Sequence, residues 1–441
     1  MDTWKLPAEF QSALRSLQTH LHERLDWRLP LLVAGIVFAQ GRRTVTSWLR
    51  AAGVGADFRT YYYCLSSLGG KASWCAISLL HLLLSRLDPG PRWLFALDDT
   101  PTQRYGPCVE GAGHHHHPSP GPTDQKFLYG HVWVTLAWLV RHPRWGTLAF
   151  PLWSQLYVRL RDVAALVPWY GWRFRTKLQL AGAMLGWLNH WLPRQGKPVW
   201  VVVDGFYAKK EFLREARRQQ MVVVGRLRKD AALRSLPPAG PRGRGRPRIY
   251  GTERISLIKR AAHRHGWQRV WVRQYGEERL KTVKTFLATW PPAGGAIRVV
   301  LVREPHGWLA YACTDVEASV EDILAVAADR GAIEQTFHDI KEVHGAGEQQ
   351  VRNLWANIGA WHLVLWVYAL IEWWAWNRSE RELCDRSASP WDDPTRRPSH
   401  GDKRKALQRQ CLEEEFSAAG RWQRCPPKIR RAVERLVKLV A

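Results

Sequence analysis

The first ninety residues show the apolar spacing of helices. Apolar positions recur every three or four residues through LLVAGIVFA and CAISLLHLLLSRL, the period of a helix that buries one face. Between these segments, in RRTVTSWLRAAGV, Thr44 or Thr46 can cap a short helix that precedes a turn at Gly53 and Gly55. This pattern is compatible with a helix-turn-helix motif that binds DNA. It is equally compatible with a helical domain that has a solvated basic edge.

From Arg92 onward, short apolar runs predict strands. WLFALDDT ends in two carboxylates, a loop rich in Gly, Pro and His extends to about Thr123, and YGHVWVTLAWLV and GTLAFPLW predict two more strands. We expect a helix around Thr176 to Leu192, a fully buried strand in PVWVVVDGF, a helix in EFLREARRQ and a strand in QMVVVGRL. This order predicts an α/β fold in which helices flank a mixed sheet that opens with an antiparallel meander.

The second half of the chain begins with a basic segment. GPRGRGRPRIYG has no apolar period and predicts a flexible arm that can lie against phosphates. A β-rich insertion is expected next, with strands in ISLIKRAA, QRVWVRQY, KTVKTFLATW, AIRVVLVRE and WLAYACTD. Helices follow in VEDILAVAADRGAIEQTFHDIKEV and in the Trp-rich run after it. SASPWDDPTRRPSHGDKRK predicts a linker, and PPKIRRAVERLVKLVA predicts a basic amphipathic helix.

Charge points to the partner. The 65 Lys and Arg exceed the 39 Asp and Glu, for a formal net charge of +26, and such a chain needs a polyanion. The basic residues are spread along the chain, which favours nucleic acid over a membrane surface. The run from Leu354 to Trp376 is apolar enough to span a bilayer, but Asn357, His362 and Glu372 within it would be costly in lipid. We therefore predict a buried helix and no membrane partner.

Cysteine and histidine usage limits the other possibilities. The seven cysteines include no C-x-x-C pair, which argues against a zinc ribbon or a disulfide framework and fits a reducing compartment. The N-terminal MDTWKLPAEF lacks the pattern of a signal peptide, so a cytoplasmic location is expected. His114 to His117 invite a metal interpretation, but a solvated loop with incidental metal affinity is the better explanation.

Acidic residues at strand ends are the candidates for chemistry. Phosphodiester transfer is achieved when two divalent ions, held by carboxylates, activate the attacking oxygen and neutralise the leaving one. Asp98 and Asp99 point to opposite faces of their strand, so one of them can join Asp204 in a site. On the later helix, Glu334 lies between two cations that stand four residues before it and seven after it, Arg330 and Lys341. These three positions fall within roughly 60° on one helix face, although an exposed salt bridge would give the same stripe.

Three motifs carry a resemblance to a known family. LDDT, VVVDGFYAKKEF and DRGAIEQTFHDIK resemble the catalytic motifs of bacterial insertion-sequence transposases of the DDE class that have a β-strand insertion before the glutamate. The glutamate helix resembles the pattern Tyr-x-x-Arg-x-x-x-Glu-x-x-x-x-x-x-Lys, matched here by Arg330, Glu334 and Lys341. Ala327 occupies the tyrosine position. Aligning the first motif as Asp-x-Thr favours Asp98 over Asp99.

The resemblance implies a ribonuclease H-like core that binds two Mg²⁺ or Mn²⁺ ions, cuts transposon ends and joins them to target DNA. It implies that Asp98 or Asp99 acts with Asp204 and Glu334, the metal ligands being Asp98, Asp204 and Glu334. The DNA contacts expected from the resemblance and from the basic arm are Arg330, Lys341, Arg242, Arg244, Arg246, Arg248 and, by base stacking, Trp308. The partners would be terminal inverted repeats, target DNA and a second subunit in a nucleoid-associated homodimer. A regulator that binds ends without cutting, or a nuclease with the same core, are the alternatives.

These expectations divide the chain into five parts. They are a helical N-terminal DNA-binding domain (1–90), the first part of the catalytic core (91–226), the basic arm and β-rich insertion (227–318), the rest of the core with the glutamate helix (319–377), and a C-terminal linker with a basic helical region (378–441).

Overall fold

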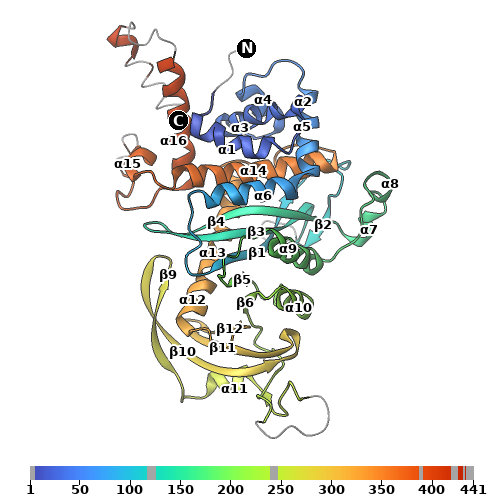
Figure 1. Cartoon of the computed structure of the whole chain (residues 1–441), viewed down its shortest axis with the longest axis vertical. Coiled ribbons are helices and arrows are strands. Elements are labelled where there is room, and N and C mark those ends of the chain that lie inside the picture. The colour runs from blue at the N-terminus through green and yellow to red at the C-terminus, as the bar shows by residue number, and fades with distance from the viewer. Residues whose placement is uncertain are drawn as a thin grey trace.

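A computed structural model describes residues 5–116, 126–238, 247–386, 391–418, 426–430 and 433. Its centre is a twelve-stranded mixed sheet flanked by helices (Figure 1). The strands follow the order β2-β3-β1-β5-β6-β12-β11-β10-β7-β8, with β4 paired to β3 and β9 paired to β10. The predicted fold class, a ribonuclease H-like mixed sheet with flanking helices and a β-rich insertion, is confirmed.

The N-terminal region is helical, as its apolar spacing predicts. Its helices are α1 (Ala8–Gln18), α2 (Glu23–Asp26), α3 (Arg28–Phe38), α4 (Val45–Ala51), α5 (Arg59–Gly70) and α6 (Ala72–Leu84). Thr44, one of the two candidate caps, accepts a hydrogen bond from the Ser47 amide at the start of α4. Close packing fixes α5 against α14 (Leu354–Ala375), since a Cβ at Gly69 or Gly359 would lie within 2 Å of a carbonyl oxygen of the other helix.

The first five long strands form the ribonuclease H-like core. They are β1 (Trp93–Gln103), β3 (Phe127–His142), β4 (Gly146–Tyr157), β5 (Val199–Val203) and β6 (Val222–Arg226). β1 pairs antiparallel with β3, and β3 with β4, whereas β1, β5 and β6 are parallel. Parallel strands need crossovers, which α9 (Lys177–Trp191) and α10 (Lys210–Arg218) provide. Two short helices, α7 (Leu160–Val163) and α8 (Val167–Tyr170), project from the connection after β4 (Figure 1).

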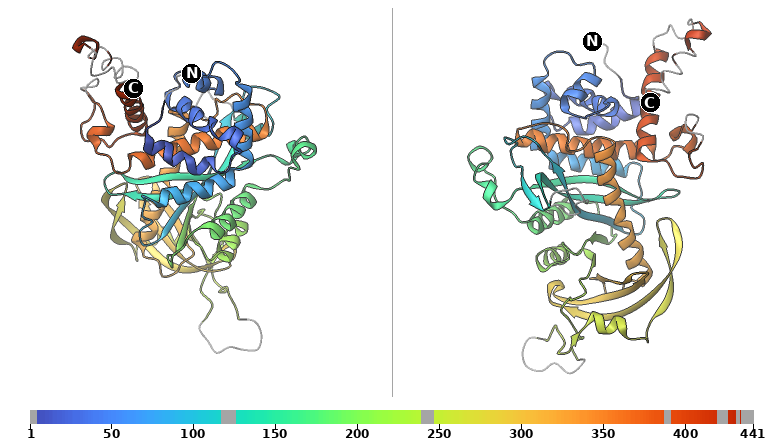
Figure 2. Two further views of the ribbon diagram at one scale, coloured as in Figure 1. Left: turned by 45° about the horizontal axis from the view of Figure 1, so that its top comes forward. Right: turned by 180° about the vertical axis from the view of Figure 1, so that it is seen from behind.

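The insertion strands extend the core sheet. β12 (Gly307–Cys313) pairs with β6, and β11 (Gly295–Glu304), β10 (Glu277–Trp290) and β9 (Gln268–Gln274) follow by antiparallel pairing. The N-terminal helices and these strands lie at opposite ends of the molecule (Figure 2). Shorter elements complete this region: β7 (Leu233–Arg234), β8 (Arg254–Ile255), α11 (Leu257–Ala262) and the 3-10 helix η1 (Pro291–Ala293).

Two local predictions in the sheet region are wrong. ISLIKRAA is largely helix α11, because the Ser256 hydroxyl accepts from the Lys259 amide and caps a helical turn where we expected a strand. The loop expected before Thr123 contains strand β2 (Gly113–His116), which pairs with β3. Within it, His115 packs against Tyr157, and burial lowers the pKa of His115 to about 4. His117 lies outside the described residues.

The last part of the chain is helical. α12 (Val320–Asp329) leads directly into α13 (Gly331–Glu342), since the intervening Arg330 keeps helical dihedral angles. α14 is long and apolar enough to cross a membrane, but it is mostly buried inside the fold, as expected of a core helix. The predicted linker, 387–405, is wrong in part, because its last six residues form the start of α16 (His400–Ala418). A short helix, α15 (Glu380–Leu383), precedes it. The start of α16 has no apolar periodicity in the sequence, because its buried face includes polar side chains. One of them is Lys403, which bonds to Glu372 inside the core.

Candidate active site

Two aspartates lie where the parallel pairing of β1 with β5 ends. Leu97 of β1 is paired with Val203 of β5, and the next residue along each strand is Asp98 or Asp204. Because β1 and β5 are neighbouring parallel strands and each acid directly follows their last pair, both acids reach the same place, and Asp98 and Asp204 interact electrostatically. The Asp98 side chain is 15% exposed. Burial and the nearby Asp204 raise the pKa of Asp98 to about 7, against the opposing effect of Arg330.

Asp99 takes a different set of partners. It accepts a hydrogen bond at 2.7 Å from the Tyr207 hydroxyl and forms an ion pair at 2.5 Å with Lys177 at the start of α9. These contacts give Asp99 two hydrogen-bonded partners, while Asp98 faces Arg330 and Asp204. The geometry therefore favours Asp98 as the metal ligand. The sequence did not single out Tyr207 and Lys177; the only signal was that each lies close in the chain to a strand end or helix start.

The glutamate helix presents its charged stripe to β1. Arg330 donates from Nη1 to Asp98 at 2.8 Å and from Nη2 to Glu334 at 2.5 Å. Lys341 donates to the Thr100 hydroxyl at 2.7 Å, and burial lowers the pKa of Lys341 to about 8. The stripe is therefore more than an exposed salt bridge, because its two cations reach Asp98 and Thr100 on the strand.

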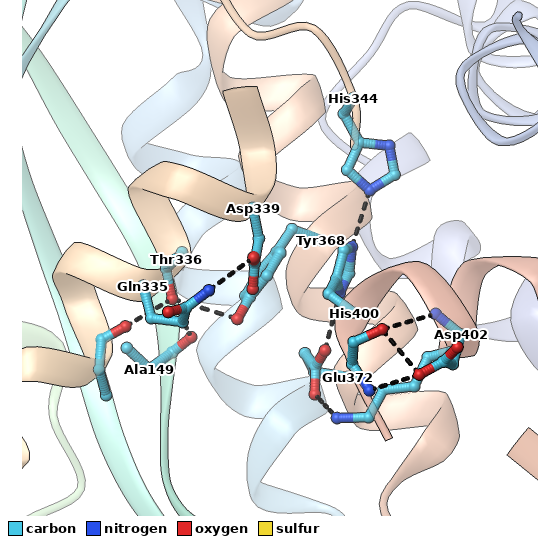
Figure 3. Close-up of polar contacts among 12 residues, drawn as sticks. Ala149, Gln335, Thr336, Asp339, His344, Tyr368, Glu372, His400 and Asp402 are labelled. Carbon is cyan, nitrogen blue, oxygen red and sulfur yellow. Dashed lines mark hydrogen bonds and ion pairs between the residues drawn. The ribbon is translucent and has the colours of Figure 1, made fainter. Parts of the chain in front are cut away.

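Contacts behind the stripe hold the helix in place. The Thr336 hydroxyl lies within hydrogen-bond distance of the Ala149 carbonyl of β4, at 3.3 Å, and of the Tyr368 hydroxyl of α14, at 3.2 Å. Figure 3 shows these bonds beside a second buried cluster, in which Glu372 binds His400. Thr336 lies two residues after Glu334, roughly 200° around the helix, so its contacts hold the face of α13 opposite the one that carries Glu334.

A cleft of about 790 Å³ opens in front of these groups. The polar side chains that line it belong to the core, the insertion and the glutamate helix: Asp204, Arg226, Arg228, Lys229, Asp230, Tyr275, Tyr311, Arg330 and Glu334. Cations outnumber acids on this wall, as a surface for an anionic backbone requires.

The acids suit a hard divalent ion. Carboxylate oxygens are the ligands that Mg²⁺ prefers, and a desolvated carboxylate beside a second acid is relieved by a bound cation. Within the described part of the chain, no three His, Cys, Asp or Glu side chains are gathered in a metal-binding group. Arg330 is hydrogen-bonded to both Asp98 and Glu334.

The remaining predicted contacts lie apart from these acids or outside the described residues. Trp308 lies on β12, half-buried, with the Lys229 ammonium 5.1 Å from its ring, and is not among the residues that line the cleft. Arg248 is exposed, and Arg242, Arg244 and Arg246 lie outside the described residues. Their DNA contacts stay predictions.

One comparison with known proteins identifies a family. The profile of a family described as DDE superfamily endonuclease matches residues 16–286, more than half of the chain. The matched segment includes Asp98 and Asp204 and ends before Glu334. A comparison with curated proteins finds no match.

Proposed function

Because the chain belongs to the DDE superfamily endonucleases, we propose that it is a transposase that cuts the ends of a DNA element and joins them to target DNA. Enzymes of this superfamily act on DNA with divalent metal ions such as Mg²⁺. The observation that carries the proposal is the meeting of Asp98, Asp204 and the Arg330–Glu334 pair at one sheet edge, beside a cleft in which four cationic side chains face three acidic ones.

In this proposal Asp98, Asp204 and Glu334 hold two Mg²⁺ or Mn²⁺ ions. The bound ions would activate the attacking oxygen and neutralise the leaving one. Asp98 would hold the metal as an ionised carboxylate, because a metal ligand must be ionised. Arg330, released from the two acids, turns to the DNA phosphate.

Lys341 and the basic arm position the DNA. The Lys341 ammonium lies at Thr100, two residues beyond Asp98, and phosphate contacts of this kind set the register without reading sequence. The formal net charge of +26 supports a backbone-dominated interaction. Because two ends must be cut together, we propose a homodimer in the complex with DNA.

The test is a cleavage and joining assay with the full chain, DNA that carries the ends of the element, and a supercoiled target. We expect cut ends and joined products with Mg²⁺ or Mn²⁺ and neither with EDTA. Cutting without joining would make the protein a nuclease, and end binding without cutting would make it a regulator. Either outcome would contradict the transposase assignment.

A further inference from the structure

A tyrosine occupies the tip of the hairpin that faces the cleft. Tyr275 and Gly276 are the two residues between β9 and β10, whose last pair is Gln274 with Glu277. Their φ angles are 56° and 86°, so both loop residues adopt the left-handed region that two-residue hairpins of type I′ require. Asn, Asp or Gly are the residues favoured at the first of these positions. A bulky tyrosine there is strained, which is typical of residues kept for a function.

The tip is fixed against the start of the glutamate helix. Gln274 donates from its side chain to the Leu324 carbonyl of α12 at 3.2 Å, and β9 runs beside α12 (Figure 1). A Cβ placed on Gly331 would lie 3.9 Å from Cε1 of Tyr275. The phenol ring therefore lies beside the first turn of α13, next to Arg330, although the Tyr275 side chain is 67% exposed.

Tyr275 shares the cleft wall with two other side chains from the sheet. Tyr311 of β12 is paired with Arg226 of β6, and both line the same cleft as Tyr275. Among the described residues, none forms a hydrogen bond with either phenol hydroxyl or an ion pair with the Arg226 guanidinium. Burial raises the pKa of Tyr311 above its ordinary value, so that hydroxyl stays protonated. The wall thus offers donors for an anion.

The glutamate helix itself lacks a phenol at the matching place. Ala327 lies three residues before Arg330 and lines the same cleft, at the position where the pattern in related glutamate helices has tyrosine. Its side chain ends at Cβ and cannot donate a hydrogen bond. Tyr275 reaches the same cleft from the insertion hairpin.

We propose that Tyr275 donates its hydroxyl to a DNA phosphate beside the acids, so that the insertion hairpin supplies the phenol that the glutamate helix lacks. The proposal rests on the proposed function. A neutral donor suits this place because Arg330 already provides the positive charge, and a hydroxyl can bind a phosphate oxygen without displacing a metal ion from Asp204 or Glu334.

Tyr275→Phe is the first test, because it keeps the ring and the turn and removes only the hydroxyl. A hydrogen bond to a charged group supports an expected loss of roughly ten- to a hundred-fold in cleavage rate at limiting DNA. The slope of binding against salt should not change, since no cation is removed. Tyr105→Phe, at a comparably exposed tyrosine that does not line the cleft, serves as the matched control and should cleave as the wild type does.

Two further variants separate binding from folding. Tyr275→Asn places a residue that the turn favours, so its melting temperature should equal or exceed that of the wild type while cleavage falls. Ala327→Tyr added to Tyr275→Phe should restore part of the cleavage rate, because a phenol returns to the same cleft.

Several results would overturn the proposal. Wild-type cleavage by Tyr275→Phe would do so, and so would a lower melting temperature in that variant, which would make the hydroxyl structural. A wild-type protein that binds ends without cutting would instead refute the proposed function. In that case the Tyr275 contact is tested by the affinity of Tyr275→Phe for a pre-nicked end. A lower affinity than that of the wild type would support the phosphate contact, and an unchanged affinity would contradict it.

Discussion

Replacing Glu372 should release the C-terminal helix from the core in a pH-dependent way. Glu372 lies on α14 with 2% of its side chain exposed, and it binds the Nδ1 of His400 at 2.7 Å and the ammonium of Lys403, both on α16. His344, which follows α13, contacts His400 through the two Nε2 atoms at 2.8 Å (Figure 3). Three segments of the chain therefore meet around one buried carboxylate, with the Tyr368 ring packed on His400.

The magnitude follows from the acidity of Glu372. Burial opposes its ionisation, but Lys403 and His400 outweigh burial and lower the pKa of Glu372 from 4.5 to about 2. At 1.36 kcal/mol for each pH unit, this difference is worth about 3 kcal/mol of folding free energy. Because the folded pKa is the lower one, this stability is fully present above pH 4.5 and is lost as the pH falls towards 2.

Glu372→Gln should therefore lower the free energy of unfolding by about 3 kcal/mol at pH 7, a cost typical of leaving a buried ammonium without its partner. Urea unfolding of the wild type and the variant measures the gap. At pH 3 the gap should shrink by about 2 kcal/mol, since most of the wild-type advantage is lost between the two pKa values. Glu413→Gln, on the exposed face of α16, is the matched control and should change stability little.

A gap of the same size at pH 7 and pH 3 would refute this reasoning, because it would show that Glu372 contributes through packing and not through its charge. Stability of Glu372→Gln equal to that of the wild type at pH 7 would refute it as well. The double variant Glu372→Gln, Lys403→Met should recover part of the stability, since the uncompensated ammonium is removed.

Two further predictions concern DNA. Lys341→Met should reduce both end affinity and cleavage, and should make the slope of log affinity against log salt shallower by about 0.9, the value of one phosphate contact; a titration with labelled ends at several salt concentrations checks this. Replacing Arg242, Arg244, Arg246 and Arg248 with alanine should make the slope shallower by about 0.9 for each phosphate that the arm no longer binds, while cleavage at saturating DNA persists. An unchanged slope would show that the arm does not contact DNA.

Much of the fold follows from local pattern. The continuous apolar run of β5 predicts a strand buried on both faces, and the structure places Val201 and Val202 in the core. Where local pattern failed, a competing local bond or a distant partner decided the outcome. Ser256 caps α11 in a segment with strand-like composition. The polar start of α16 resembles a linker until Glu372, 31 residues before Lys403, is known to face it.

The candidate site, like the fold, could be predicted only in part from local sequence. Asp204 could be proposed from its place at a strand end, and the spacing of Arg330, Glu334 and Lys341 could be measured along the helix. The contact between Arg330 and Asp98 joins residues 232 positions apart, so no local pattern contains it. Tyr275 gives no signal in the sequence, because its position beside Gly331 depends on how the hairpin packs against α12.

The most direct test of the central claim is Mg²⁺-dependent cutting of end DNA by three variants of the full chain. Asp98→Asn and Glu334→Gln should bind ends as tightly as the wild type and cut none of them, whereas Asp99→Asn should keep measurable cutting despite losing the Lys177 ion pair and weakening the Tyr207 contact. Wild-type cutting by either Asp98→Asn or Glu334→Gln would contradict the proposed site.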